Sequence, residues 1–400
     1  MARPMYVKLS EIQKDDDQIK IYSLSPDTSY VVSGCAGSGK SALALLLLEQ
    51  IISRGENDES PNQIYYIATV HELVECVRKQ FMRFNKVPQF NDYAITGAAW
   101  KDKLISDLQR RGQAQNGPFL IHGRRCMQGE PRGFNNNWVD LKINPHPDYL
   151  LIDEAQDFDL GTLKSFKSAA KKGCVFYGDD AQKIIQNGTS LDVLCRTLGI
   201  QRYRLKRNWR LSKEIARFAQ ALPGQNLNDD LVRRCRGEYH EKPVVYGCNG
   251  ECGLQSYILE RCTKATVDDD IGVILRSNRQ IHRWYEFFSA QLGRSMVSAR
   301  YSYDETTPFG MQHSCYDYLR QTPIKILRYE DAKGQQFRDV YIIADQTLMQ
   351  NPLGMECFYV GVTRAERFLY VLYDGQMPAF LQNVDPDTFE TSDTSTTIEF

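Results

Sequence analysis

The sequence predicts an α/β protein with two mainly parallel sheets, each flanked by helices. Short runs rich in β-branched and aromatic residues alternate with helical patterns over most of the 400 residues, as in chains built from strand–helix–strand units. Apolar residues make up 42% of the chain, which is enough to fill the cores of two or three domains. The expected strands also fall into two groups of similar size.

The first group of elements lies before residue 200. The strands expected there are residues 30–34, 63–69, 92–96, 148–153 and 173–179. Apolar spacing typical of helices is found at residues 41–52 and 71–81. Residues 112–147 are rich in Gly, Asn, Arg and Pro, which predicts a long irregular connection at the surface.

The second group follows a polar helix expected at residues 190–200. Its expected strands are residues 202–205, 243–247, 271–276, 324–329, 339–345 and 368–374. We therefore expect one domain over residues 1–203 and a second over residues 204–382. Residues 383–400 are acidic, rich in hydroxyl side chains and poor in core residues, which predicts a mobile tail.

Composition narrows the class of protein without identifying a partner. The formal net charge is −1, so no general basic surface is expected, although local basic patches remain open. The eleven cysteines are an odd number, and the first residues lack the charged-then-apolar pattern of a secretory leader. No apolar run approaches the roughly 20 residues of a membrane span. We expect free thiols, a cytoplasmic location and no membrane partner.

Four cysteines raise the question of a zinc site. Only Cys248 and Cys252 form a close pair, and Cys235 and Cys262 lie at spacings unlike those of zinc fingers or ribbons. We interpret them as cysteines carried by a strand and a helix.

A phosphate-binding loop is predicted directly after the first strand. Gly34, Gly39, Lys40 and Ser41 match the pattern G-x-x-x-x-G-K-[ST] in the required order of strand, loop and helix. Glycines let the backbone N–H groups turn inward, the helix presents its positive end, and the lysine reaches the outer phosphates. The residues expected to bind ATP here are Gly34, Ala36, Gly37, Ser38, Gly39, Lys40 and Ser41.

An acidic pair predicts the rest of a hydrolytic site. Asp153 and Glu154 follow the apolar strand at residues 148–153, at the sheet edge where the phosphate loop should also lie. We expect Asp153 and Ser41 to hold Mg²⁺, and Glu154 to orient or deprotonate the attacking water.

Seven segments together carry a family resemblance. The segments GCAGSGKS, LIDEAQDF and FYGDDAQKI resemble motifs one to three of the UvrD/Rep-type superfamily 1 DNA helicases. The segments LKRNWRLSKEI, IGVILRSNRQ, AKGQQF and YVGVTRAE are similar to later motifs of that family and occur in the same order. The resemblance spans about residues 15–375 and implies two tandem RecA-like P-loop NTPase domains. It also implies an ATP-dependent enzyme that moves along single-stranded nucleic acid, typically DNA from 3′ to 5′, with RNA left open.

The resemblance further implies roles for single residues. Gln18 would read the adenine, and Gln182 would sense the γ-phosphate. Arg210 and Arg364 would act as arginine fingers from the second domain, assisted by Arg276. Gly334 and Gln336 fall in the segment that would help to bind the nucleotide.

The sequence also departs from the family pattern. Val70, Ile185 and Asn187 stand where the family usually has aromatic rings, Glu330 where it commonly has histidine, and Gln336 where it normally has glutamate. Other residues that could contact nucleic acid are Thr69, His71, Trp100 and Trp209, with Arg110, Arg111, Arg124 and Arg125 as further candidates for phosphate contacts. The intervals between the motifs leave no room for large accessory subdomains, so strong duplex unwinding by this chain alone is not assured.

Two other functions stay open at this point. Val70, Ile185 and Asn187, which replace aromatic rings, motivate the alternative of an ATP-switched regulatory or interaction subunit that serves a partner such as a nuclease or another effector. A small-molecule kinase would use the phosphate loop, but it would leave Arg210, Arg364 and the whole second domain unexplained.

Overall fold

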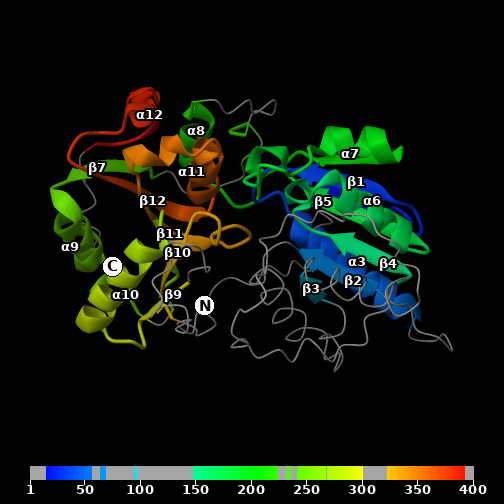
Figure 1. Cartoon of the computed structure of the whole chain (residues 1–400), viewed down its shortest axis with the longest axis horizontal. Coiled ribbons are helices and arrows are strands. Elements are labelled where there is room, and N and C mark those ends of the chain that lie inside the picture. The colour runs from blue at the N-terminus through cyan, green and yellow to red at the C-terminus, as the bar shows by residue number, and fades with distance from the viewer. Residues whose placement is uncertain are drawn as a thin grey trace, which may run out of the picture. The chain divides into compact units, whose positions relative to one another are not determined.

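The computed structural model describes residues 15–55, 64–68, 94–96, 147–223, 231–233, 235, 241–266, 268–300 and 322–391. These residues form two compact units, which divide between Lys206 and Arg207 (Figure 1). Each unit contains a six-stranded sheet in which all neighbouring strands are parallel. The predicted fold class, two mainly parallel sheets flanked by helices, is confirmed.

The first sheet has the strand order β3-β2-β4-β5-β1-β6. Its strands are β1 (Tyr30–Gly34), β2 (Ile64–Ala68), β3 (Ala94–Thr96), β4 (Tyr149–Ile152), β5 (Gly173–Gly178) and β6 (Gln201–Leu205). Because β5 lies between β4 and β1, the segments that follow these three strands leave the same edge of the sheet side by side. Val31 and Val32 point to opposite faces and are both fully buried, which explains why this strand is an uninterrupted apolar run.

Helices cover both faces of the first sheet (Figure 1). The α-helices are α2 (Asp16–Tyr22), α3 (Lys40–Gly55), α6 (Leu160–Ala169) and α7 (Leu191–Leu198), and η2 (Ala155–Asp157) and η3 (Asp180–Gln182) are short 3₁₀ helices. One core cluster joins the leucines of α3 to one face of the sheet, and another joins α6 and α7 to the opposite face. The side chains of Asp159 and Ser190 cap α6 and α7 by accepting backbone N–H groups of the first turn.

Strand β6 belongs to the first sheet, although residues 202–205 were expected in the second. It pairs with β1 in parallel from Tyr30 opposite Gln201 to Gly34 opposite Leu205. Only Gly199 and Ile200 separate α7 from β6, and Gly199 ends the helix in the left-handed conformation at φ 63°. Such a short connection returns the chain to the sheet against which the helix already packs, so the earlier assignment was wrong.

The second sheet has the order β7-β12-β11-β8-β10-β9. Its strands are β7 (Val244–Cys248), β8 (Ile271–Leu275), β9 (Val297–Ala299), β10 (Ile324–Arg328), β11 (Phe337–Ile343) and β12 (Ala365–Asp374). Strand β9 was not predicted, because three residues are too few for a recognisable period.

Helices flank this sheet as well. They are α8 (Lys213–Ala221), α9 (Gly250–Cys262), α10 (Asn278–Leu292), α11 (Gly354–Val362) and α12 (Ala379–Gln382), with the 3₁₀ helices η5 (Gln346–Gln350) and η6 (Pro386–Thr388). Helices α9 and α10 pack on one face and share a core cluster with it, whereas α8 and α11 lie together over the other face (Figure 1).

Part of the segment expected to be a mobile tail, residues 383–390, is packed on the second unit. Residues 383–390 lie against the second unit, where Val245 N donates to Glu390 O at 2.8 Å and Glu390 N donates to Pro243 O at 2.9 Å. Phe389 is buried, and the centroid of its ring lies 6.0 Å from that of Phe218 in a T-shaped arrangement. One aromatic anchor and two backbone hydrogen bonds thus hold a segment whose composition alone predicts mobility. Residues 392–400, and the helix expected at 71–81, lie outside the described residues.

Candidate functional site

The loop after β1 has the backbone that a phosphate loop requires. Gly37 and Gly39 have φ of 76° and 93°, in the left-handed region that favours glycine. A Cβ atom on Gly34 would lie 2.4 Å from Ser38 Oγ and 2.9 Å from Leu205 Cβ, so this position also excludes a side chain. The loop ends at the first turn of α3, where backbone N–H groups and the helix dipole favour an anion.

Lys40 folds back over this loop. Its Nζ donates to Gly34 O at 2.8 Å and to Cys35 O at 3.1 Å, and the residue is buried. The hydroxyl oxygen of Ser38 is also buried and has no hydrogen-bond partner among the described residues. A buried ammonium group and an unpaired hydroxyl at a helix N-terminus are groups that a bound phosphate would satisfy.

Asp153 joins the acidic segment after β4 to the phosphate loop. Its Oδ2 accepts hydrogen bonds from Ser41 Oγ at 2.8 Å and from the hydroxyl of Tyr66 on β2, and its Oδ1 accepts from Glu154 N at 2.9 Å. Burial is the main cause that raises the pKa of the Asp153 carboxyl, and the charge of Glu154 adds to it; the two hydroxyl donors and Lys40 oppose the rise. Burial and the adjacent Asp153 raise the pKa of the Tyr66 hydroxyl, so it stays a donor.

Glu154 has an unusual backbone conformation. Its φ of 52° and ψ of 43° make it the one non-glycine residue with positive φ among the described residues. Gln156 holds its side chain, since Gln156 Nε2 donates to Glu154 Oε2 at 2.7 Å. The other end of the same amide, Oε1, accepts from Asp179 N at 3.0 Å. Gln156 therefore connects the segment after β4 to the segment after β5.

Asp179 is a further carboxylate at this edge. Its Oδ1 accepts from Ala181 N at 3.1 Å, whereas its Oδ2 is buried and has no hydrogen-bond partner among the described residues. Burial raises the pKa of the Asp179 carboxyl, and the nearby charge of Lys40 lowers it. Gln156 and Asp179 were not predicted as site residues. Asp179 directly follows the buried strand β5, and Gln156 comes four residues after the end of the buried strand β4, so the signal that could have found them is a polar residue just after a buried strand.

Gln18 contacts the phosphate loop from α2. Its Nε2 donates to Ser38 O at 3.0 Å, and a Cβ atom on Gly39 would lie only 2.5 Å from that nitrogen. Asp15 caps α2 by accepting from the N–H groups of Asp17 and Gln18, which places the glutamine on the first turn of the helix.

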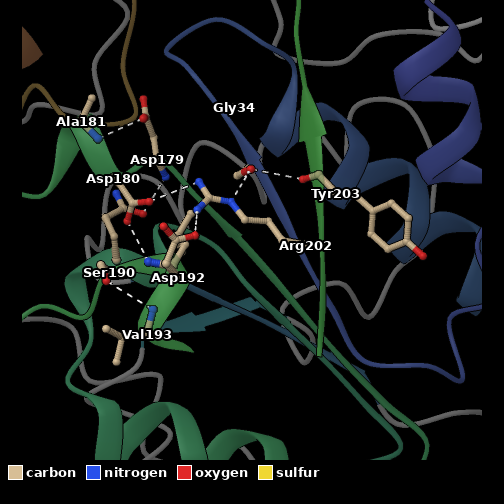
Figure 2. Close-up of polar contacts among 12 residues, drawn as sticks. Gly34, Asp179, Asp180, Ala181, Ser190, Asp192, Val193, Arg202 and Tyr203 are labelled. Atoms are coloured by element: carbon tan, nitrogen blue, oxygen red, sulfur yellow. Dashed lines mark hydrogen bonds and ion pairs between the residues drawn. The ribbon is translucent and has the colours of Figure 1, made fainter. Parts of the chain in front are cut away.

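Gln182 ends η3, the short helix that follows Asp179, and it is buried. An ion-pair network holds this segment. Figure 2 shows Arg202 of β6 reaching Asp180 and Asp192, with the Asp180 contact at 3.2 Å. Arg202 Nε also donates at 2.9 Å to Ser33 Oγ, in the residue before Gly34. The edge strand thereby links the γ-phosphate sensor expected at Gln182 to the phosphate loop.

The arginines expected to act as fingers lie in the second unit. Arg210 follows Asn208, whose Oδ1 accepts from Arg210 N at 2.9 Å, and its side chain is half-buried. Arg276 follows β8 and lies 3.9 Å from Asp345 Oδ2. Arg364 is 2% exposed, and its guanidinium donates to Val360 O, Gln335 O and Thr363 Oγ1 at 2.9–3.1 Å.

The segment that contains Gly334 and Gln336 leads into β11. Gly334 has φ of 76°, which favours glycine, and Gln336 is half-buried directly before the strand. Both belong to the second unit, and so does Glu330.

Most of the residues expected to contact nucleic acid fall outside the described residues: Thr69, His71, Trp100, Arg110, Arg111, Arg124 and Arg125. Val70, one of the positions without the family's aromatic ring, lies outside them as well. Trp209 and Ile185 are half-buried, and Asn187 is exposed.

The first unit thus brings Gln18, the phosphate loop, Asp153 and Glu154 to one edge of one sheet. The oxygen donors of Ser41 and Asp153 are the kind that Mg²⁺ prefers, and the buried Oδ2 of Asp179, which has no hydrogen-bond partner among the described residues, is a further oxygen near Lys40. The residues present therefore fit a magnesium–triphosphate group.

Comparison with models of protein families finds no match, and neither does comparison with curated proteins. Among solved structures, the chain is similar to S. cerevisiae Dbp5 bound to RNA and ADP–BeF₃, with a TM-score of 0.50 and 12% identity over 96% of this chain and 90% of that chain. It is also similar to the C-terminal domain of a possible DNA helicase from Lactobacillus plantarum WCFS1, with a TM-score of 0.32 and 16% identity over 46% of this chain and 98% of that chain. The likeness to Dbp5 shows the fold, which is the RecA-like helicase fold.

None of the helices that the structure describes combines the length and apolar character that a membrane span requires.

Proposed function

We propose that this chain is an ATP- and magnesium-dependent enzyme of the superfamily 1 helicase type, which couples ATP hydrolysis to movement along single-stranded nucleic acid. The observation that carries the proposal is the hydrogen bond of 2.8 Å between Ser41 Oγ and Asp153 Oδ2. It joins a loop shaped for phosphate to a buried carboxylate, and Glu154 follows at once. The RecA-like fold supports the same class of function.

In this proposal each polar group of the first unit has a task. Lys40 exchanges its two carbonyl acceptors for phosphate oxygens, and the backbone N–H groups at the start of α3 bind the β-phosphate side of the nucleotide. Ser41 and Asp153 hold magnesium, which when bound supplies positive charge to the phosphate oxygens. Glu154, held by Gln156, orients the attacking water and accepts its proton.

The second unit supplies arginines in this proposal. Arg210 and Arg364 act as fingers, and Arg276 assists them. For Arg364 this role requires the guanidinium to exchange the carbonyl acceptors of its own unit for phosphate oxygens. An arginine finger is worth about 10³ to 10⁵ in rate, so each substitution by lysine should show clearly in kcat.

The test compares ATP hydrolysis at low salt without a strand and with single-stranded, duplex and tailed oligonucleotides of DNA and of RNA. We expect stimulation by single strands, with DNA preferred, and translocation from 3′ to 5′. A Lys40→Ala chain is the negative control and should lose both basal and stimulated hydrolysis. Equal rates with every strand would overturn the motor function.

Ile185 and Asn187 favour a second function, because the UvrD/Rep-type helicases that this sequence resembles usually have aromatic rings at these positions. Base stacking on such a ring is worth about 1 to 3 kcal/mol per base, so their loss weakens the grip on a strand. The alternative is an ATP-switched regulatory subunit for a nuclease or another effector. It predicts ATP binding, slow turnover and no response to any strand.

Restoring the rings separates the two functions. In a motor with a weakened grip, Ile185→Tyr and Asn187→Trp together should tighten binding of single strands and raise the stimulation of ATP hydrolysis. In a regulatory subunit the same chain should bind strands no better than the wild type.

A further inference from the structure

Tyr66 donates a hydrogen bond to Asp153, the aspartate that is expected to hold magnesium. It is in the middle of β2, its side chain is fully buried, and its register partner on the neighbouring β4 is Leu151. From there its hydroxyl reaches past the end of β4 and donates to Asp153 Oδ2. The residue lies outside the seven segments that carry the family resemblance.

Three donors hold the Asp153 carboxylate. Ser41 Oγ and the Tyr66 hydroxyl both donate to Oδ2, and Glu154 N donates to Oδ1. A carboxylate has about four acceptor positions, so these bonds leave one position on Oδ1. Ser41 and Glu154 approach from the phosphate loop and from the acidic segment itself, whereas Tyr66 approaches from β2.

The three donors differ in whether they have a further role when a nucleotide binds. In the proposed function, Ser41 also holds the metal and belongs to the phosphate loop, and Glu154 also orients the attacking water. Tyr66 has neither task, because its ring lies in the core cluster that joins β2 to α3. It is therefore the donor that can keep the carboxylate in place while the loop changes its contacts.

We propose that Tyr66 is a positioning residue that orients Asp153 for a magnesium-bound nucleotide. The inference rests on the proposed function of this site. Donors behind a metal-binding carboxylate set its direction, and removing one typically costs about 10- to 100-fold in metal affinity or activity. If Tyr66 only fills the core, its hydroxyl affects stability but not the magnesium requirement.

Tyr66→Phe tests this inference, because it removes the hydroxyl and keeps the ring. The measurement is the Mg²⁺ concentration for half-maximal binding of a fluorescent ATP analogue, which does not depend on hydrolysis. We expect this concentration to rise about 10-fold, while binding of the analogue without Mg²⁺ stays at the wild-type level.

Tyr149→Phe is the matched control. The Tyr149 hydroxyl donates to Asp27 Oδ1 at 2.6 Å, so this variant also loses a tyrosine–aspartate hydrogen bond, but at the opposite end of β4. It should keep the wild-type Mg²⁺ requirement.

Each result of the titration has a defined meaning. A wild-type chain that binds no analogue at any Mg²⁺ concentration would overturn the proposed function. A wild-type chain that binds, beside a folded Tyr66→Phe chain with the same Mg²⁺ requirement, would overturn this inference alone. If Tyr66→Phe unfolds too readily for the titration, all three chains are measured in trimethylamine N-oxide, which favours the folded state. An equal Mg²⁺ requirement there would overturn the inference as well.

Discussion

Replacing Gln156 by leucine removes the link between the two polar segments of the site. Gln156 is 0% exposed and makes two hydrogen bonds, from its Nε2 to Glu154 Oε2 at 2.7 Å and to its Oε1 from Asp179 N at 3.0 Å. Leucine fills a similar volume but makes neither bond. The substitution therefore removes the Gln156 donor from the Glu154 carboxylate and the Gln156 acceptor from the Asp179 N–H group.

The expected loss of stability follows from these two bonds. A hydrogen bond to a charged group contributes about 1.5 to 3 kcal/mol, and a buried donor left without a partner costs about 1 to 3 kcal/mol. We expect Gln156→Leu to lower the free energy of unfolding by about 3 to 5 kcal/mol. This is a large share of the total for a single domain, which is about 5 to 15 kcal/mol.

The same substitution should slow hydrolysis. Without the Gln156 hydrogen bond, the Glu154 side chain is no longer fixed in its position at the left-handed turn. Misplacement of a catalytic group by about 1 Å can lower the rate about 10²-fold. Urea unfolding followed by circular dichroism measures the first effect, and steady-state ATP hydrolysis measures the second. Gln255→Leu is the control, because it removes a buried glutamine from α9 in the other unit. Wild-type unfolding together with a wild-type kcat in Gln156→Leu would refute the reasoning.

Two further predictions concern the second unit. Phe389→Ala should lower the free energy of unfolding by about 3 kcal/mol, because it leaves a cavity beside Phe218. An unchanged urea midpoint would contradict the packing of residues 383–390 on the second unit. Burial raises the pKa of the Asp270 carboxyl, so the folded chain holds that proton at a pH where the unfolded chain has released it. The wild type should therefore lose stability relative to Asp270→Asn as pH rises above about 4, and urea midpoints with the same pH dependence in both chains would contradict this.

The parts of the site that the sequence predicts are local in the chain. The glycines of the phosphate loop, Lys40 and Ser41 lie within eight consecutive residues, Gly34 to Ser41, and positive φ at Gly37 and Gly39 is a property that glycine alone adopts cheaply. Asp153 and Glu154 follow a strand that is buried on both faces, which an apolar run indicates without any knowledge of its neighbours.

The parts that were missed depend on which strands are neighbours. Gln156 can accept from Asp179 N only because β5 lies beside β4, and Tyr66 can reach Asp153 only because β2 lies on the other side of β4. An apolar run does not specify its position in a sheet. Residues 202–205 were expected in the wrong sheet because an edge strand with alternating polar residues fits the edge of either sheet.

Local chemistry alone determined that this chain has strands, helices, a glycine-rich loop before a helix and an acidic turn, because these follow from backbone conformation and side-chain type within a few residues. The order of the strands was decided only by the tertiary structure, and with it the hydrogen bonds of Gln156 and Tyr66 and the docking of residues 383–390. The bond from Asp179 N to Gln156, the bond from Tyr66 to Asp153 and the two backbone bonds of Glu390 join residues 23 to 147 positions apart, and such residues meet only through the way the layers of the fold pack together.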